Sequence, residues 1–271
     1  MRSIFAAARS THVRRAIPGA GALATVAFGT AALTAAGAGV ASAAMPSASG
    51  LAMKLVSPST LASNGSYKLQ LSLQNPSSNV CGTGLSRAIQ NDPNGHPGTY
   101  EIVARFPGTK FTDLASTSWG LTTYRANPRD CNGNFGAPVF TPTFTPTVVD
   151  DPFNLPSGVG VLRTAANAYG GAQLQVTSGV NSHARWSTDD VFNLGVVIGT
   201  GPHGGIANLF VDGVKKGQIN FYSAKAVYRK VTYSYNTPSD HVHQIDVVTA
   251  KQGTGGGTEM YLDAGIENAF P

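Results

Sequence analysis

Charged residues are scarce in this chain of 271 residues, at 12% of the sequence. Beyond the first 15 residues no stretch of it is rich in lysine or arginine, which argues against binding to the phosphate backbone of nucleic acids. After residue 44 no segment keeps a 3.6-residue hydrophobic period over three turns, so long amphipathic helices are not expected. Only two cysteines are present, enough for one disulfide.

Sequence motifs of common hydrolases are also missing. The chain has no G-x-S-x-G and no H-E-x-x-H, and a disulfide would leave no cysteine for catalysis. Asp189 and Asp190 are adjacent in a predicted turn and are interpreted as solvated acids, although a glycosidase pair of carboxylates stays open as an alternative. We therefore predict a protein that is not an enzyme and has no catalytic residues.

Residues 1–43 have the composition of an export signal. A basic stretch without acids precedes an apolar run rich in Ala and Gly, and "ASAA" ends it as an A-x-A-like cleavage site. Cleavage after Ala43 would remove Arg2, Arg9, Arg14 and Arg15, which leaves 15 of the 19 Lys and Arg against 14 Asp and Glu. The alternative is an uncleaved anchor. We predict a secreted, extracellular or cell-wall-associated protein with no membrane attachment after cleavage.

Short alternating runs broken by Gly, Pro and Asn dominate the rest, which is typical of antiparallel β-sandwiches. In residues 45–147 the cleanest run places Tyr67, Leu69, Leu71 and Leu73 on one face of a strand. Its opening pattern is loosely immunoglobulin-like. Cys81 and Cys131 are predicted to form a disulfide in an oxidising compartment, and its reduction is expected to destabilise this domain alone.

A doubled F-T-P-T stands in "FTPTFTPTVVDDP", residues 140–152. Alternate prolines cannot donate to a β-ladder, so this segment is predicted to be an edge strand or an extended linker between two domains. Residues 149–271 then give eight or nine short strands, the number expected of a jelly-roll sandwich. The predicted fold is all-β, an immunoglobulin-like sandwich followed by a jelly roll.

The stretch "GTGPHGGIANLFVDG", residues 199–213, contains the G-x-G-x-x-G pattern of dinucleotide-binding turns. Such a turn needs a helix directly after its glycines and an acid about 20 residues further on. Neither is present. Asp212-Gly213 between alternating hydrophobic residues instead predicts a tight β-hairpin.

Several pieces of the C-terminal region resemble a known module. They are "DDPFNLPSGVGVLRTAANAYGGAQLQVTSG", "GVVIGTGPHGGIANLFVDGVKKGQINFYS", "YRKVTYSYN", "HQIDVV" and "YLDAG". Together they are similar to the jelly-roll ancillary module of secreted actinobacterial proteins, itself similar to carbohydrate-binding modules, over about residues 149–267. The resemblance implies a non-catalytic sandwich that binds a polysaccharide or cell-wall glycan.

The resemblance also implies a structural calcium ion between an acid at the start of the module and one in its last strand. Asp150 or Asp151, with Asp263, are the matching residues. Solvated acids at strand ends are the alternative. Trp186 matches a packed aromatic residue of the module.

Aromatic rings are natural platforms for sugars, because a ring face stacks on the C–H groups of a pyranose. Tyr222 and Tyr235 stand near predicted strand ends and are the candidate ligand-binding residues. Val231 and Tyr233 are expected to point inward together with Val227.

Two further patterns suggest metal ligands. His241 and His243 lie two residues apart on one strand face, but sequence alone locates no third ligand, and a structural role for His243 is favoured. "DCNGNFG", residues 130–136, resembles the start of a calcium loop but lacks its sixth-position glycine and twelfth-position glutamate, so a turn beside the disulfide is preferred.

The sequence thus favours a secreted glycan-binding protein with no cofactor other than calcium. A structural or adhesive surface protein with protein partners is the main alternative, and a glycan-active hydrolase is the third.

Overall fold

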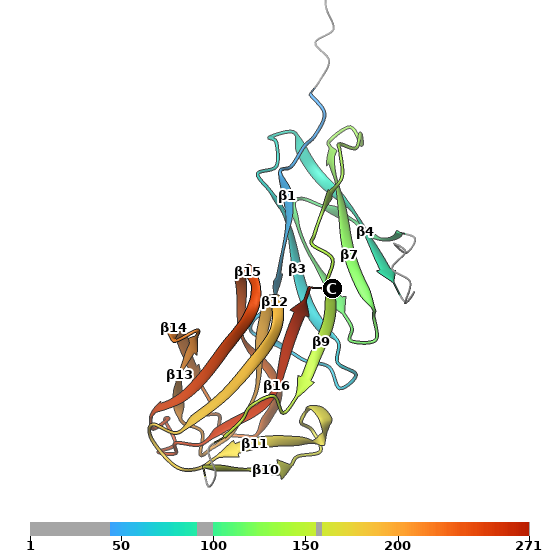
Figure 1. Ribbon diagram of the computed structural model, residues 1–271. Helices are drawn as coiled ribbons and strands as arrows, with labels where there is room; N and C mark the ends of the chain where they lie inside the picture. The colour runs from blue at the N-terminus through green and yellow to red at the C-terminus, as the bar shows by residue number, and fades with distance from the viewer. Residues whose placement is uncertain (1–43, 91–99, 156–158, 271) are drawn as a thin grey trace, which may run out of the picture. The chain divides into compact units, whose positions relative to one another are not determined.

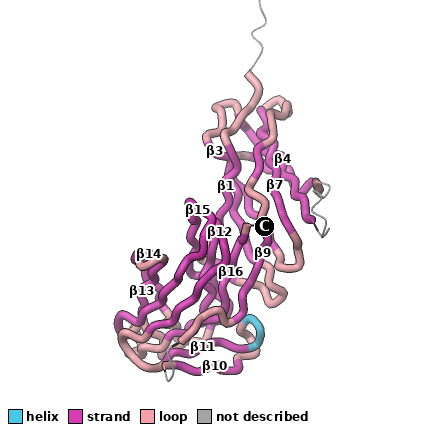
Figure 2. Tube along the Cα trace, viewed as in Figure 1, coloured by secondary structure: helices cyan, strands magenta, loops and turns pink. Residues whose placement is uncertain are grey.

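The computed structural model describes residues 44–90, 100–155 and 159–270, so the predicted signal segment 1–43 lies outside the described residues. Apart from one short 3-10 helix, η1 (Tyr169–Gly171), every regular element in these ranges is a β-strand (Figure 2). None of these ranges contains a helix long and apolar enough to cross a membrane. The predicted all-β class is confirmed.

Residues 44–144, called here the N-terminal sandwich, form two antiparallel sheets. One has the order β1 (Gly50–Leu55), β3 (Tyr67–Gln74), β6 (Lys110–Ala115). The other has the order β5 (Glu101–Pro107), β4 (Val80–Gln90), β7 (Leu121–Asp130), β8 (Val139–Phe140). Seven strands divided in this way give an immunoglobulin-like sandwich. The predicted alternation in β3 is confirmed, since every second residue from Tyr67 is buried.

The predicted disulfide between Cys81 and Cys131 is present. It joins β4 to the residue after β7, and these two strands are neighbours in one sheet. In the adjoining turn the carboxylate of Asp130 accepts the backbone N–H groups of Asn132 at 2.9 Å and Asn134 at 2.8 Å. The side chain therefore closes a local turn, as preferred over a calcium loop.

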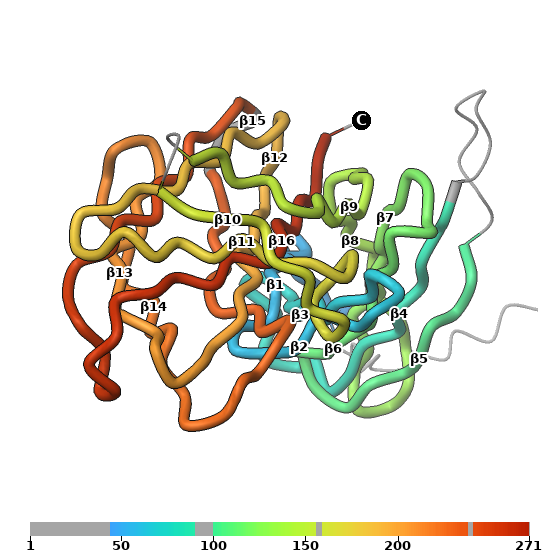
Figure 3. The backbone as a smooth tube through the Cα atoms, turned by 90° about the horizontal axis from the view of Figure 1, so that it is seen from below, coloured from blue at the N-terminus to red at the C-terminus, as the bar shows by residue number. Residues whose placement is uncertain are grey.

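Residues 145–270, called here the C-terminal sandwich, contain the larger sheet, whose path runs β10-β11-β16-β12-β15-β13-β14 (Figures 1 and 3). β9 pairs with β16, and β2 (Ser59–Thr60) pairs with β15. The other bounds are β9 (Thr145–Asp150), β10 (Gly160–Thr164), β11 (Ala172–Val176), β12 (His183–Thr200), β13 (Ile206–Val211), β14 (Val214–Asn220), β15 (Val227–Lys251) and β16 (Met260–Ala269). The path folds over to give the two layers of a jelly roll.

Two long strands belong to both layers. In one layer the first part of β12 pairs with the last part of β15, and that part of β15 also pairs with β13. In the other layer the rest of β12 lies between the first part of β15 and β16 and pairs with both. Pairing shifts between Ser187 and Asp190 and between Val191 and Asn193 mark the bends. The prediction of eight or nine short strands was wrong here. "NSHARWS" and "LGVVIG" are one strand, as are "AVYRKVTYSYN" and "HVHQIDVVTA", because a bulge breaks the alternation without ending the strand.

One layer of the jelly roll is buried on both faces. Val196 and Ile198 of β12 pack into the core of the C-terminal sandwich, while Val197 packs into the core of the N-terminal sandwich. Gly195 allows this close approach, because a Cβ there would lie 2.8 Å from Leu55 Cδ1. β16, with nine of its ten residues buried, has the same two-sided burial. The two sandwiches therefore share a hydrophobic core.

The predicted domain boundary at residues 140–152 contains an edge strand. Phe144 bonds to Thr122 of the N-terminal sandwich, and the next residue begins β9, which pairs with β16. Residues 44–271 form one compact unit. Whether residues 45–147 and 149–271 would fold as separate domains stays a prediction from sequence.

Bulges also change which face of β15 each side chain takes. Tyr233 pairs with Val196 and Val231 with Val197, so Thr232 is an extra residue between them. Val231 consequently faces the N-terminal core, and Tyr233 faces the C-terminal one. Val227 is 46% exposed. The expectation that Val227, Val231 and Tyr233 share one inward face was wrong.

The hairpin predicted at Asp212-Gly213 is confirmed. β13 and β14 pair up to Val211 and Val214, and the two turn residues have φ of 51° and 74°. Positive φ at both central positions is the type I′ geometry that favours Asp-Gly. Gly201, Gly204 and Gly205 lie in the connection from β12 to β13, as expected, Gly199 belongs to β12, and no helix follows.

Candidate functional site

The three acids predicted to hold calcium lie in one region, where β9 ends beside β16, but their carboxylate oxygens are not all within 4.8 Å of one another. Asp150 pairs with Ala264, and the N–H of Asp151 donates to the carbonyl of Asp263 over 3.4 Å. Asp263 is fully buried. It is the extra residue of a bulge, since Leu262 and Ala264 pair with consecutive residues of β12. The bulge sets the Asp263 side chain beside the end of β9.

Backbone groups complete the surroundings of Asp263. Its Oδ1 accepts the N–H of Tyr169 at 2.8 Å, and its Oδ2 accepts the N–H of Arg229 at 3.1 Å. The carboxylate of Asp150 lies against Gly170, where a Cβ would be 1.8 Å from Oδ2. Gly170 also has a φ of 65°. Glycine suits this position because it accepts positive φ and because any side chain would collide with Asp150.

Burial disfavours the ionisation of all three carboxylates, and neighbouring acids add to this effect at Asp151 and Asp263. Burial, with the charge of Asp150, raises the pKa of Asp151 to about 6. Burial also raises the pKa of Asp263 to about 6, with a smaller contribution from the two neighbouring acids. Asp151 Oδ1 is buried and has no hydrogen-bond partner. Oxygen donors, crowded negative charge and an unpartnered acceptor suit a calcium ion, which prefers carboxylate and carbonyl oxygens.

β14 is the edge strand of the larger sheet. Tyr233 and Tyr235 of β15 are half-buried against the C-terminal core and lie close to residues of β14. Lys216 of β14 places its Nζ 4.8 Å from the centre of the Tyr235 ring. A Cβ at Gly217 would lie 3.9 Å from the Tyr233 ring, so the glycine leaves space over that ring. Burial, with Tyr235 close by, raises the pKa of Tyr233 to about 12.

A groove of about 470 Å³ lies between β15 and the N-terminal sandwich. Its lining is Lys54, Leu55, Val56, Ser57, Gln70, Thr232, Tyr233 and Ser234. The volume is within the range of small-molecule sites, and the polar side chains can both donate and accept hydrogen bonds. The groove therefore combines one aromatic residue with several polar groups.

Tyr222 lies elsewhere, at the end of the sandwich that carries the glycine-rich connections. It is half-buried rather than exposed. A Cβ at Gly255 would lie 2.7 Å from its ring, and one at Gly253 would lie 3.2 Å from its Cβ. Tyr222 follows β14 and so lies near a strand end as expected, whereas Tyr235 lies inside β15 and not near a strand end. Both are only partly exposed, because each ring packs against a neighbouring segment.

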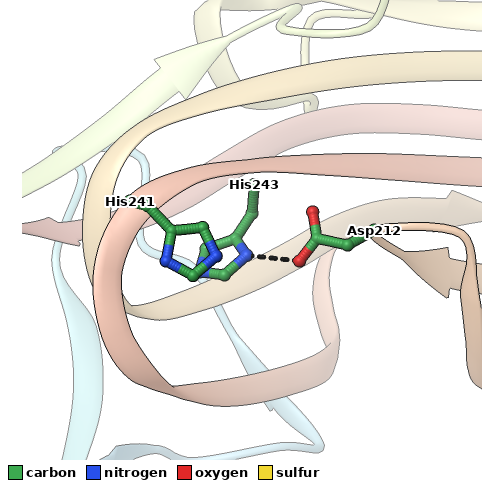
Figure 4. Close-up of side chains that lie close together, drawn as sticks. All are labelled: Asp212, His241 and His243. Carbon is green, nitrogen blue, oxygen red and sulfur yellow. Dashed lines mark hydrogen bonds and ion pairs between the residues drawn. The ribbon is translucent and has the colours of Figure 1, made fainter.

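Asp212, His241 and His243 form a second cluster of titratable side chains (Figure 4). His243 is buried and its Nδ1 lies 2.6 Å from Asp212 Oδ2. The other carboxylate oxygen accepts the N–H of Gln244 at 2.9 Å. Partial burial opposes ionisation of Asp212, but the hydrogen bonds from Gln244 and His243 outweigh it and hold the pKa below its usual value. The His241 and His243 rings are 4.3 Å apart.

Glu267 is a buried acid at the junction of the two sandwiches. It is 2% exposed, and burial, with the nearby charge of Asp189, raises its pKa to about 7. Next to it in β16, Asn268 accepts the Tyr67 hydroxyl at 2.6 Å and donates to Asn193 at 3.0 Å. Glu267 itself is not one of the residues that line the groove described above.

The sequence matches no known family profile and no curated protein. Among solved structures, the chain is similar to a family 35 carbohydrate-binding module from an environmental isolate, with 15% identity over 46% of this chain and 98% of that one and a TM-score of 0.35. A family 36 carbohydrate-binding module in complex with calcium and xylotriose has 16% identity over 45% and 98%, and a TM-score of 0.30.

An exo-β-1,3-galactanase from Phanerochaete chrysosporium matches over 78% of this chain and 56% of its own length, with 12% identity and a TM-score of 0.32. Likeness at these TM-scores supports no inference about what this chain binds. Its function has to be argued from its own residues.

Sequence reasoning missed several members of these sites. It did not place Lys216 beside Tyr235, nor Lys54 and Gln70 in the groove. It also found no third partner for His241 and His243, although Asp212 had been assigned to a turn. No local signal links these residues, because strand pairing and layer packing bring them together.

Proposed function

We propose that this chain is an exported, non-catalytic protein that binds a polysaccharide or cell-wall glycan through its C-terminal sandwich. The observation that carries the proposal is the 470 Å³ groove lined by Tyr233 and several polar groups, with half-exposed Tyr235 two residues further along the same strand, beside Lys216. Export is supported by the signal-like composition and cleavage pattern of residues 1–43.

The chemistry of the groove suits a sugar better than a charged or fully apolar ligand. A tyrosine ring offers an apolar face to pyranose C–H groups while its hydroxyl stays in water. Lys54, Ser57 and Gln70 line the same groove and can exchange hydrogen bonds with sugar hydroxyls. One or two rings with a few convergent polar groups are a common composition of small-ligand sites.

Replacing Tyr235 by Ala should weaken polysaccharide binding by about 1–3 kcal/mol, as expected when a single aromatic anchor is truncated. The exported chain, whose N-terminal residue should be Ala44, would be tested in pull-down and calorimetric assays against a panel of insoluble and soluble polysaccharides. The melting temperature would be measured alongside, because Tyr235 packs partly against the C-terminal core and a loss of folding would show that its ring belongs to that core.

Tyr228→Ala is the matched control, since Tyr228 is a half-exposed tyrosine at the start of the same strand that neither lines the groove nor has the Lys216 contact of Tyr235. Tyr222→Ala reports on the opposite end of the sandwich. If Tyr222→Ala abolishes binding while Tyr235→Ala retains it, the Tyr233–Tyr235 segment of β15 is not the site. Failure of the wild-type chain to bind any polysaccharide would favour a structural or adhesive protein, and soluble sugar released from the polymers would identify a hydrolase.

We also propose that Asp150, Asp151 and Asp263 hold a structural calcium ion. At a calcium concentration 100-fold above the dissociation constant, the free energy of unfolding should rise by about 2.7 kcal/mol. Thermal melts with CaCl2 and with a chelator measure the effect. Asp150→Asn should remove it with little cost to the fold, because Asp150 is exposed. Melting curves that do not respond to calcium would contradict the proposal.

A further inference from the structure

The cluster of Asp212, His241 and His243 brings together three side chains of the kinds that bind transition metals. One donor atom from each residue lies within 4.8 Å of the donors of the other two, and among the described residues no other group of three or more His, Cys, Asp or Glu does so. His241 and His243 come from one face of β15, and Asp212 comes from the β13–β14 turn (Figure 4). Two different segments thus build the cluster.

The buried ring of His243 supplies an independent indication of a ligand. It is 2% exposed, and its Nε2 is buried without a hydrogen-bond partner. A buried nitrogen without a hydrogen-bond partner destabilises the folded protein unless a ligand binds to it. Nδ1 is held by Asp212 at 2.6 Å, which fixes the orientation of the ring. A carboxylate on one histidine nitrogen with the other nitrogen available is the usual arrangement of a metal-binding histidine.

The His241 ring is placed to share such a ligand. It is exposed, and its centre lies 4.3 Å from that of His243. Zinc–nitrogen distances of about 2.0–2.1 Å place tetrahedral donors about 3.4 Å apart. The separation within the cluster is up to 4.8 Å, so the donors need to close by a modest movement. His241 and Asp212 are exposed and can make it, while His243 is held in place.

We propose that His241 and His243 bind a divalent transition-metal ion of the zinc class, with Asp212 positioning His243. Imidazole nitrogen suits zinc, copper and nickel, whereas calcium requires oxygen donors. The site is open to solvent on the side of His241, so water completes the coordination. The site is separate from Asp150, Asp151 and Asp263. Tyr235 lies beside it, with its ring centre 6.3 Å from that of His243. The proposal does not depend on glycan binding.

Isothermal titration of the untagged, chelator-treated chain with ZnCl2 tests the proposal. One ion should bind per chain. His241→Ala should lower the affinity more than about 100-fold, and Asp212→Asn by about 10–100-fold, because the amide keeps the turn but holds the ring less firmly. His241 is exposed, so its variant should melt like the wild type.

His183→Ala is the matched control, since His183 is an exposed histidine of β12 outside the cluster. It should bind zinc as the wild type does, and so should Asp150→Asn. Excess CaCl2 should not displace the zinc. Absence of zinc binding by the wild type, equal affinity in His241→Ala, or displacement by calcium would each overturn the assignment.

Discussion

Reduction of the Cys81–Cys131 disulfide should lower the free energy of unfolding by about 4 kcal/mol, because the bond closes a loop of about 50 residues in the unfolded chain. Reduction should destabilise both sandwiches together. Val197 and Ile266 of the C-terminal sandwich pack in the same core as Leu71 of the N-terminal one, so the loss of one sandwich exposes the other.

The two tryptophans allow each sandwich to be followed separately. Trp119 lies in the N-terminal sandwich with the Arg87 guanidinium 4.0 Å from its ring centre, and Trp186 lies in the C-terminal core. Trp119→Phe and Trp186→Phe variants would be unfolded in urea with and without reductant. Both should show the same shift of midpoint upon reduction. A shift of the midpoint reported by Trp119 but not by Trp186 would support the expectation from sequence that the disulfide stabilises residues 45–147 alone.

Replacing Glu267 by Gln should stabilise the protein by about 3 kcal/mol above pH 7. Burial raises the pKa of Glu267 in the folded chain from 4.5 to about 7, and each unit corresponds to about 1.4 kcal/mol. Because the folded pKa is the higher one, the contribution to stability is complete below pH 4.5 and is lost as pH rises to 7. The variant cannot ionise and should escape this loss.

Denaturant unfolding of both proteins between pH 4 and 8 measures the difference. The two stability curves should converge near pH 4 and separate progressively toward pH 7. Glu101→Gln, at an exposed position of β5, is the control and should follow the wild type. Parallel curves for wild type and Glu267→Gln would mean that the carboxylate is hydrated or paired in solution.

Features that depend on a few consecutive residues were predictable from the sequence. The β13–β14 hairpin follows from Asp212-Gly213, since few residues other than Asn, Asp and Gly accept positive φ at both turn positions. The alternation of Tyr67 to Leu73 defines β3, and the turn at Asp130 follows from a short side chain bonding its own neighbours. The meeting of Asp150 and Asp151 with Asp263 was expected only through resemblance to a known module.

Features that depend on pairing between distant segments were decided by the tertiary structure. Tyr67 bonds to Asn268 across 201 residues, and Asp212 to His243 across 31. Thr232 is an extra residue in β15, and the side chains after it therefore point to the opposite face from the one that simple alternation predicts. The sequence does not reveal the position of this bulge, because a bulge accepts many residue types. The sequence by itself determined strands, turns and the all-β class through local backbone preferences. Which faces are buried, where the groove opens and which side chains meet His243 depended on how the two sandwiches pack, since burial of apolar surface acts between segments regardless of their separation in the chain.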